Sequence, residues 1–382
     1  MRVLGMISGT SHDGVDTALV DFSADGELLR GTVIAAGSVP YPDDLRARLL
    51  AALPPAAVPL AEVCALDTLL GQHFAQRAAA VTTGRQVDLI CSHGQTVFHW
   101  VADGRAAGGL QLGQPAWIAE ATGVPVLSDI RSRDIAAGGH GAPLVPILDT
   151  LLLGGLPGRS AALNLGGIAN MTVLSAGTAS YAYDLGPANA LIDDAVRRHT
   201  GASYDVDGAL AAAGTVDDAL LAELLAEPYY RLPAPKSTGK ELFHAQYLAD
   251  HLGRHQQVGP VDVIATVTAL TAEVVAADVR RAGVDAVVAS GGGVANPTLM
   301  RMITDRLPGV AIRTTDEFGA PADTKEAIAF ALIGYLSAHG LPGNVPSCTG
   351  ASGPRILGGL VPGHAPLPTW PTVPVPRRLV LT

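Results

Sequence analysis

A unit of strand, glycine-rich turn and strand occurs twice in this chain, and this recurrence constrains the fold more than any other feature. The first copy covers residues 2–21, where a β-prone run, the turn ISGTSHDG and a second β-prone run follow each other. The second copy covers residues 161–174, with the sequence AALNL, the turn GGIAN and the run MTVL. We therefore expect two α/β lobes, residues 1–145 and residues 146–382.

Composition excludes several classes of protein. At 382 residues, with 48% hydrophobic and 16% charged residues, the chain is long and apolar enough for more than one core. The net charge of −10, with no basic stripe to offset it, argues against nucleic acid as a partner. We expect a compact enzyme-like α/β protein.

The termini, cysteines and apolar runs indicate a cytoplasmic protein. The first residues lead directly into a strand, so we expect no signal peptide. The most apolar run, residues 261–279, contains acidic residues, and we interpret it as a buried helix instead of a membrane span. The cysteines, odd in number and far apart, favour a reducing compartment; they are Cys64, Cys91 and Cys348.

The segment YDLGPANALID, residues 183–193, places a carboxylate where ligands collect in α/β proteins. Asp184 follows a β-prone pair, Gly186-Pro187 breaks the strand, and an apolar-periodic helix begins at Asn189. An acid at the carboxyl end of a strand, facing a helix N-terminus, can act as a general base. The alternative is that Asp184 only caps the helix or bonds to the turn.

The turn at residues 9–16 suits a nucleotide. Its glycines expose backbone N–H groups that can bind phosphates, and Asp13 and Asp16 can hold the accompanying Mg²⁺. A tight hairpin without a ligand is the alternative. The run Gly291–Gly293, between a strand and a helix, allows a flat ligand to approach the backbone, although Asn296 replaces the last glycine of a dinucleotide fingerprint.

Three further polar segments are candidates for ligand contact. We expect a short strand at residues 87–92, which places Ser92, His93, Gln95 and Thr96 at its end. The charged, glycine-rich loop at residues 129–140 suits a polar substrate, or is a solvated surface loop. We expect Lys236 to contact an anion or to be exposed.

We expect the tail after residue 352 to run extended along the surface.

Together these segments resemble one family of the actin-like ATPase superfamily, the anhydro-N-acetylmuramic acid kinases. The motifs that carry the resemblance extend from residue 4 to about residue 352; they are MISGTSHDGVD, SHGQTVFH, DIRSRDIAAGGHGAPLVP, LNLGGIANMTVL, YDLGPANALID, PAPKSTGKELF, SGGGVANPTLM and LPGNVPSCTGAS. Their joint occurrence is far more specific than any one of them.

The resemblance implies a two-lobed actin-like (ribonuclease H-like) fold, in which each lobe is a mixed sheet flanked by helices, and a homodimer. It implies a kinase that uses ATP, Mg²⁺ and water to convert 1,6-anhydro-N-acetylmuramic acid into N-acetylmuramic acid 6-phosphate and ADP, in cell-wall recycling. Asp184 is then the general base, and Arg131 and Glu326 position sugar or water. The residues expected to bind the nucleotide are Gly9, Thr10, Ser11, His12, Asp13, Gly14, Val15, Asp16, Gly166, Gly167, Gly291, Gly292, Gly293 and Asn296.

Three positions depart from the family's pattern. His12 stands where leucine is frequent, His140 where glutamine is usual, and Ala188 where the family has glycine. Unlike glycine, alanine requires an ordinary φ at this position. Two other functions stay open at this point: a sugar kinase of the same superfamily that phosphorylates an ordinary hexose, and an actin-like or heat-shock-like ATPase. The charged loop at residues 129–140 and the lack of a peptide-binding domain disfavour the ATPase.

Overall fold

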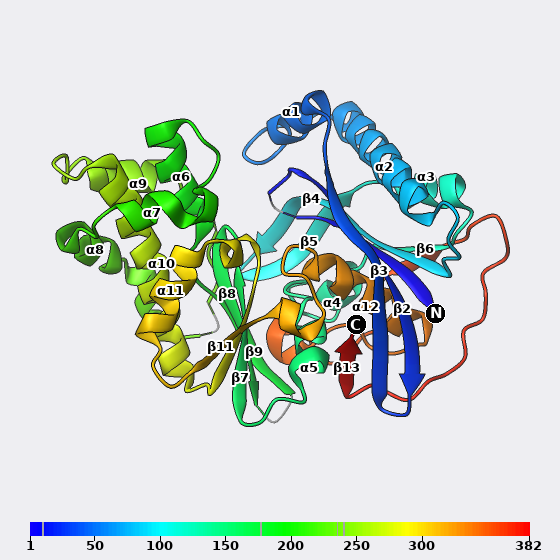
Figure 1. Ribbon diagram of the computed structural model, residues 1–382. Helices are drawn as coiled ribbons and strands as arrows, with labels where there is room; N and C mark the ends of the chain where they lie inside the picture. The colour runs from blue at the N-terminus through cyan, green and yellow to red at the C-terminus, as the bar shows by residue number, and fades with distance from the viewer. Residues whose placement is uncertain (10, 176–177, 235, 240) are drawn as a thin grey trace. The chain divides into compact units, whose positions relative to one another are not determined.

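The computed structural model describes residues 1–9, 11–175, 178–234, 236–239 and 241–382 (Figure 1). The chain forms two compact units. Unit 1 consists of Met1–Gly155, Phe318–Ala320 and Thr324–Thr382, and unit 2 of Leu156–Glu317 and Pro321–Asp323.

This division differs from the expected boundary after residue 145. Helix α5 (Pro146–Leu153) packs against helix α12 (Lys325–Ala338) and strand β13 (Arg378–Leu381), all in unit 1. Strand β13 also joins the sheet of unit 1, parallel to β3. The last part of the chain therefore returns to the first unit, so the two units are not two consecutive halves.

The sheet of unit 1 contains eight strands in the order β12-β6-β4-β1-β2-β3-β13, with β5 paired to β4. Strands β1, β2 and β3 form an antiparallel meander, and β4 and β6 continue parallel to β1. The bounds are β1 (Arg2–Ser8), β2 (Gly14–Asp25), β3 (Leu28–Pro40), β4 (Leu89–Ala102), β5 (Arg105–Leu112), β6 (Val126–Ser128) and β12 (Gly359–Val361).

The sheet of unit 2 repeats the same central order with five strands, β11-β10-β7-β8-β9. Strands β7, β8 and β9 form the antiparallel meander, and β10 and β11 continue parallel to β7. The bounds are β7 (Arg159–Leu165), β8 (Ile168–Ser175), β9 (Thr178–Pro187), β10 (Ala286–Ser290) and β11 (Ala311–Thr314). The shared order of meander and two parallel strands confirms the expected fold class of two lobes, each a mixed sheet flanked by helices.

Helices cover both faces of the sheet in unit 1. On one face, α2 (Leu60–Thr82) contributes Leu66, Leu70 and Phe74 to a core shared with the meander. On the other face α12 lies directly on β1, where a Cβ at Gly5 would collide with the backbone of Ala327 and Ala331. The remaining helices are α1 (Asp43–Ala51), α3 (Pro115–Thr122), α4 (Ser132–Ala136) and α13 (Pro346–Thr349).

Helix α10 (Pro260–Ala282) forms the centre of unit 2. Residues 263–272 of this helix are all buried, and it packs against four other helices and against the meander. Its length and apolarity alone would allow it to cross a membrane, but most of it is enclosed within the unit, as we expect for a core helix. The other helices are α6 (Asn189–Thr200), α7 (Ala209–Ala213), α8 (Asp218–Leu225), α9 (Ala245–Leu252) and α11 (Pro297–Arg306).

One local prediction was wrong. The strand expected at residues 87–92 continues to Ala102, because its second half pairs with β5 in a hairpin. Gln95 and Thr96 are therefore inside a strand and not at its end. The proline-rich tail is irregular and mostly exposed between residues 362 and 377, as expected, and it ends in the regular strand β13.

Candidate active site

On its buried side, the turn between β1 and β2 is held in place by Gln95. This side chain is fully buried; its Nε2 donates to the carbonyl of Gly9 at 3.1 Å, and its Oε1 lies 2.6 Å from the hydroxyl of Ser8. The same hydroxyl lies 2.6 Å from the carbonyl of Gly14, so its single proton links one of these acceptors at a time. Gln95, expected to contact a ligand, thus bonds to the first end of the turn, and the Ser8 hydroxyl lies between Gln95 and the second end.

The exposed side of the turn carries the polar groups. The Ser11 hydroxyl donates to Asp13 Oδ1 at 2.6 Å, and both side chains are exposed. Among the described residues, no hydrogen bond is formed by the backbone N–H of Ser11 or of Asp13, so these donors suit phosphate oxygens. His12 adopts a left-handed φ of 54°. Thr10, also expected to bind the nucleotide, lies outside the described residues.

Two members of the predicted nucleotide set serve the fold. A Cβ at Gly14 would collide with the carbonyl of Val39, so glycine allows β3 to approach β2. The side chain of Val15 is fully buried in the core of unit 1. Only their backbone groups remain for a ligand.

Acidic groups gather beside this turn. Asp16 is half-buried in β2, and Glu326 lies in the first turn of α12, where a Cβ placed on Gly9 would be 3.9 Å from its Oε2. Desolvation by the surrounding protein and the negative charge of Asp16 raise the pKa of Glu326. The positive charges of Arg131 and Lys325 oppose this shift. Acids that repel each other are stabilised by a divalent cation.

A complete protein cage for a metal is absent from the described residues, since no three His, Cys, Asp or Glu side chains converge on one point there. Mg²⁺ does not require one, because it is commonly bound by one or two carboxylates together with phosphates and water. The coupled carboxylates of Asp16 and Glu326 beside the turn fit this chemistry.

Arg131 is fixed by two acceptors in unit 1. Its Nε donates to His93 Nε2 at 2.7 Å, and its Nη1 donates to the carbonyl of Gly141 at 2.7 Å. His93 is buried with Nδ1 2.9 Å from the carbonyl of Gly94, which places its proton on Nδ1. Burial and the charge of Arg131 lower the pKa of His93 well below its usual value. His93, expected to contact a ligand, thus orients Arg131.

The guanidinium of Arg131 stays charged at neutral pH. Burial lowers its pKa to about 10, against the opposing charges of Glu326 and Asp134. Its remaining N–H groups suit an anionic or hydroxyl-rich ligand.

Asp134, in the charged loop, has a structural role that the sequence did not indicate. It is fully buried, where Oδ1 accepts from Asn344 Nδ2 at 2.6 Å and from the Thr349 hydroxyl at 2.7 Å. Its Oδ2 accepts from the backbone N–H of Gly141 at 2.8 Å. Asp134 therefore ties the charged loop to the segment around α13 and fixes the carbonyl that holds Arg131. The only signal in the sequence was the joint presence of the two distant motifs that contain these residues, DIRSRDIAAGGHGAPLVP and LPGNVPSCTGAS.

In unit 2, Asp184 lies on β9 with one carboxylate oxygen held by two donors. Its Oδ2 accepts from the Ser237 hydroxyl at 2.8 Å and from the Thr238 N–H at 3.1 Å. No described residue donates to Oδ1. Burial raises the pKa of Asp184, although these two hydrogen bonds oppose the shift. A desolvated carboxylate with one oxygen fixed and one available is suited to accept a proton.

The turn at Gly166 and Gly167 supports helix α6. The carbonyl of Gly167 accepts from Ala188 and Ala190, and that of Gly166 from Asn189, each at 3.0 Å. Ala188 has φ of −123°, which lies outside the left-handed region that favours glycine. The backbone N–H groups of Ala188, Asn189 and Ala190 are thus used within unit 2, and nucleotide binding by Gly166 and Gly167 stays a prediction.

The three-glycine run combines packing and exposure. A Cβ at Gly291 would lie 2.6 Å from Asn164 Oδ1, and one at Gly293 would lie 2.6 Å from the Cβ of Leu165. A Cβ at Gly292 would meet only Asn189 Nδ2, at 3.6 Å. Asn296 is buried and caps α11 by accepting from the N–H of Leu299 at 3.0 Å. Of these four residues, Gly292 presents the most open backbone.

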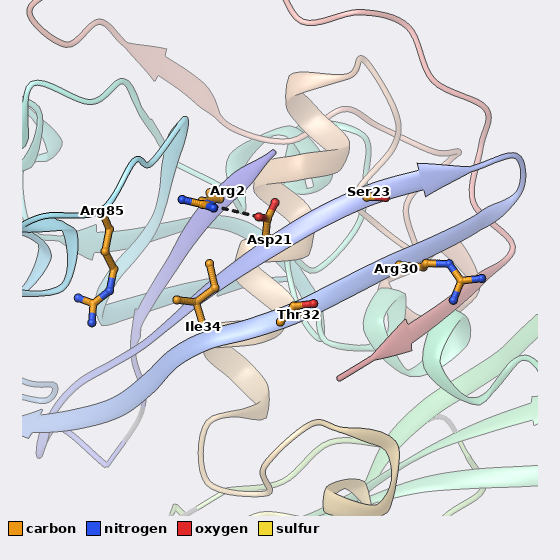
Figure 2. Close-up of a pocket in the computed structure, with 7 residues that line it drawn as sticks. All are labelled: Arg2, Asp21, Ser23, Arg30, Thr32, Ile34 and Arg85. Atoms are coloured by element: carbon orange, nitrogen blue, oxygen red, sulfur yellow. Dashed lines mark hydrogen bonds and ion pairs between the residues drawn. The ribbon is translucent and has the colours of Figure 1, made fainter.

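A surface pocket of about 610 Å³ in unit 1 contains none of the predicted site residues. Figure 2 shows its arginines, with Arg2 paired to Asp21 and Arg30 farther along the β2–β3 ribbon. Arg30 lies 3.7 Å from Asp25. Two of the three arginines that line the pocket therefore already face carboxylates. The predicted site residues lie elsewhere: the β1–β2 turn, Arg131 and Glu326 in unit 1, and Asp184 in unit 2.

Comparison with known proteins identifies the family of the chain. The family model described as anhydro-N-acetylmuramic acid kinase matches residues 1–363. An anhydro-N-acetylmuramic acid kinase of Streptomyces coelicolor is 53% identical, over 96% of this chain and 95% of that protein. One of Rhodococcus erythropolis is 51% identical, over 98% of this chain and 97% of that protein.

Solved structures are more distant. The activator of the 2-hydroxyisocaproyl-CoA dehydratase from Clostridium difficile with bound ADPNP matches with a TM-score of 0.43 and 13% identity, over 88% of this chain and 94% of that chain. The fold assignment therefore rests on the strand order of the two sheets. From the family match and the relatives together, the chain belongs to the anhydro-N-acetylmuramic acid kinase family.

Proposed function

We propose that this chain is an ATP-dependent kinase that opens 1,6-anhydro-N-acetylmuramic acid with water and phosphorylates the freed O6. The products are N-acetylmuramic acid 6-phosphate and ADP. The observation that carries the proposal is Asp184, an aspartate whose Oδ2 is held by Ser237 and Thr238 while Oδ1 has no donor among the described residues, in a chain of this kinase family.

Asp184 acts as the general base. Its Oδ1 takes a proton from water as the water oxygen bonds to the anomeric carbon and the bond between that carbon and O6 breaks. The electron pair of the broken bond remains on O6, which then bonds to the transferred phosphoryl group; ADP is released and Asp184 returns its proton to solvent. The raised pKa of Asp184 makes it a stronger base than an ordinary aspartate.

Arg131, Glu326 and the β1–β2 turn contribute positioning and charge. Arg131 and Glu326 orient the sugar and water, with Arg131 held rigid by His93 and Gly141. ATP supplies the phosphoryl group, with its charge neutralised by Mg²⁺. The N–H groups of Ser11 and Asp13 suit its phosphates, Asp13 and Asp16 supply carboxylates for Mg²⁺, and Gly292 offers open backbone for the adenosine.

The substrate test compares sugars under identical conditions. ADP release is measured with Mg²⁺, ATP and either 1,6-anhydro-N-acetylmuramic acid, N-acetylmuramic acid or glucose. We expect ADP release with the anhydro sugar and no more than background with the others. Equal or faster release with glucose would identify an ordinary hexose kinase, and ATP hydrolysis independent of any sugar would identify an ATPase.

The proposal includes a cytoplasmic homodimer. The cysteines are unpaired, with Cys91 buried and Cys64 exposed, as in a reducing compartment. Light scattering coupled to size-exclusion chromatography would detect twice the chain mass for a dimer; a monomer mass at micromolar concentration would contradict it.

A further inference from the structure

Lys236 occupies a place that neither of its expected roles explains. The lysine is buried, with only 3% of its side chain exposed, so it is not a surface residue. Its Nζ donates to the carbonyls of Tyr229 at 3.2 Å and Tyr230 at 3.3 Å and lies 4.6 Å from the centre of the Tyr229 ring. It therefore points into unit 2 and not toward an anionic ligand.

The charge partner of Lys236 is Asp278, on the core helix α10. Its Oδ2 lies 4.0 Å from Lys236 Nζ, and its side chain is likewise only 3% exposed. The other oxygen of Asp278 accepts from the Tyr183 hydroxyl at 3.4 Å and pairs with Arg281. A buried lysine without a partner would be strongly unfavourable, so the pair fixes the path of the chain at residue 236.

Lys236 is also linked to several contacts that hold Asp184, through its own backbone, the next two residues and Tyr229. The carbonyl of Lys236 accepts from the backbone N–H of Asp184 at 3.0 Å. The next two residues donate to Asp184 Oδ2, and the Tyr229 hydroxyl donates to the carbonyl of Asp184 at 2.7 Å. Tyr183, the strand neighbour of Asp184, bonds to Asp278.

We propose that Lys236 and Asp278 are positioning residues for the general base: their buried pair anchors the segment 236–238 so that Ser237 and Thr238 hold Oδ2 of Asp184 and leave Oδ1 for water. This inference rests on the proposed role of Asp184. Neither residue reaches the substrate. They act by positioning the carboxylate of Asp184. Small displacements of a reacting group can reduce rates as much as roughly a hundredfold.

The test begins with Lys236→Met, which keeps most of the side-chain volume and removes the charge. We expect kcat to fall roughly tenfold or more, with KM for ATP within about twofold, because binding is retained and only the geometry of the base is lost. The melting temperature also falls, because the buried Asp278 loses its buried cationic partner and keeps only Arg281. Arg306→Met is the matched control: it breaks the Arg306–Glu273 pair at 2.8 Å, elsewhere in unit 2, and leaves kcat unchanged.

Lys236→Met/Asp278→Asn separates positioning from stability. Removing both charges restores much of the melting temperature, whereas kcat stays low because the anchor is still missing. Recovery of kcat together with the melting temperature would overturn the inference, since the pair would then be only structural.

A double-mutant cycle tests the route through Ser237. If Lys236 acts by holding this segment, Ser237→Ala reduces kcat in the wild type but has little further effect in the Lys236→Met background. Fully additive losses would overturn the inference. Asp184→Asn, measured in parallel, distinguishes the two levels: if it retains turnover, both the base and its anchor are rejected; if it loses turnover while Lys236→Met does not, only the anchor is rejected.

Discussion

The turn between β1 and β2 and the turn between β7 and β8 occupy the same place in two sheets of the same strand order, yet they work in opposite ways. The first presents the side chains of Ser11 and Asp13 and is fixed from behind by Gln95. The second uses the carbonyls of Gly166 and Gly167 to bind the start of α6, next to the strand that carries Asp184. A shared topology places both turns, but the first presents polar side chains whereas the second presents backbone carbonyls to α6.

The largest effect is expected at Asp184. Asp184→Asn keeps the shape and the accepting oxygen but not the basicity, so we expect turnover to fall by about 10² or more while ATP binding is retained. Steady-state kinetics and nucleotide-binding calorimetry measure the two quantities. Asp194→Asn, which breaks only the surface pair with Arg197, is the control. Turnover within tenfold of wild type would remove Asp184 from the base role.

The next effect tests the first turn. Asp16→Asn removes one carboxylate proposed for Mg²⁺, so we expect kcat/KM to fall roughly tenfold and the Mg²⁺ concentration for half-maximal rate to rise. Initial rates over a Mg²⁺ titration measure this. Asp25→Asn, on the same strand and with an exposed carboxylate, should behave as wild type. An unchanged Mg²⁺ requirement in Asp16→Asn would place the metal elsewhere.

A matched pair of glycines sharpens the description of unit 2. Gly293→Ala forces a methyl group against Leu165 and should destabilise the protein by about 1–3 kcal/mol. Gly292→Ala meets only Asn189 and should leave the melting temperature unchanged while raising KM for ATP. Thermal unfolding and kinetics distinguish the two. Equal destabilisation by both variants would show that the whole run serves packing.

The smallest effect is a shift in pH dependence. The general base must be deprotonated, so activity is lost as pH falls through the pKa of Asp184, which lies above its ordinary value. Ser237→Ala removes a hydrogen bond that lowers this pKa, so the acid limb of kcat should move upward by about half to one pH unit. Ser237→Thr keeps a hydroxyl and serves as control. A downward shift, or none, would assign the limb to another group, such as Glu326, whose pKa is also raised.

Local patterns predicted the repeated elements well, because strand alternation and glycine turns are encoded by neighbouring residues. The run at residues 261–279 was expected to form a buried helix, and it lies within helix α10 (Pro260–Ala282). What could not be predicted depends on long-range pairing. Nothing near Lys236 indicates that it meets Asp278, and nothing near Asp134 indicates Asn344 and Thr349. The return of the last segment to unit 1 is likewise set by β13 pairing with β3.

The candidate site shows the same limit. Asp184 was predicted from its place at the end of a strand, which is a local signal, and its role as a base stays a prediction. The sequence did not indicate that His93 bonds to Arg131 or that Gln95 bonds to Gly9, because a polar residue near a turn can contact a ligand or the chain itself.

The central claim is that one site couples the opening of the anhydro ring by water to phosphorylation of O6. The most direct measurement is an NMR time course of 1,6-anhydro-N-acetylmuramic acid with ATP and Mg²⁺ in ¹⁸O-labelled water. We predict a single product with ¹⁸O on the anomeric carbon and an unlabelled oxygen joining phosphorus to C6. Label in the C6–O–P bridge, or phosphate on a ring that remains closed, would contradict the account.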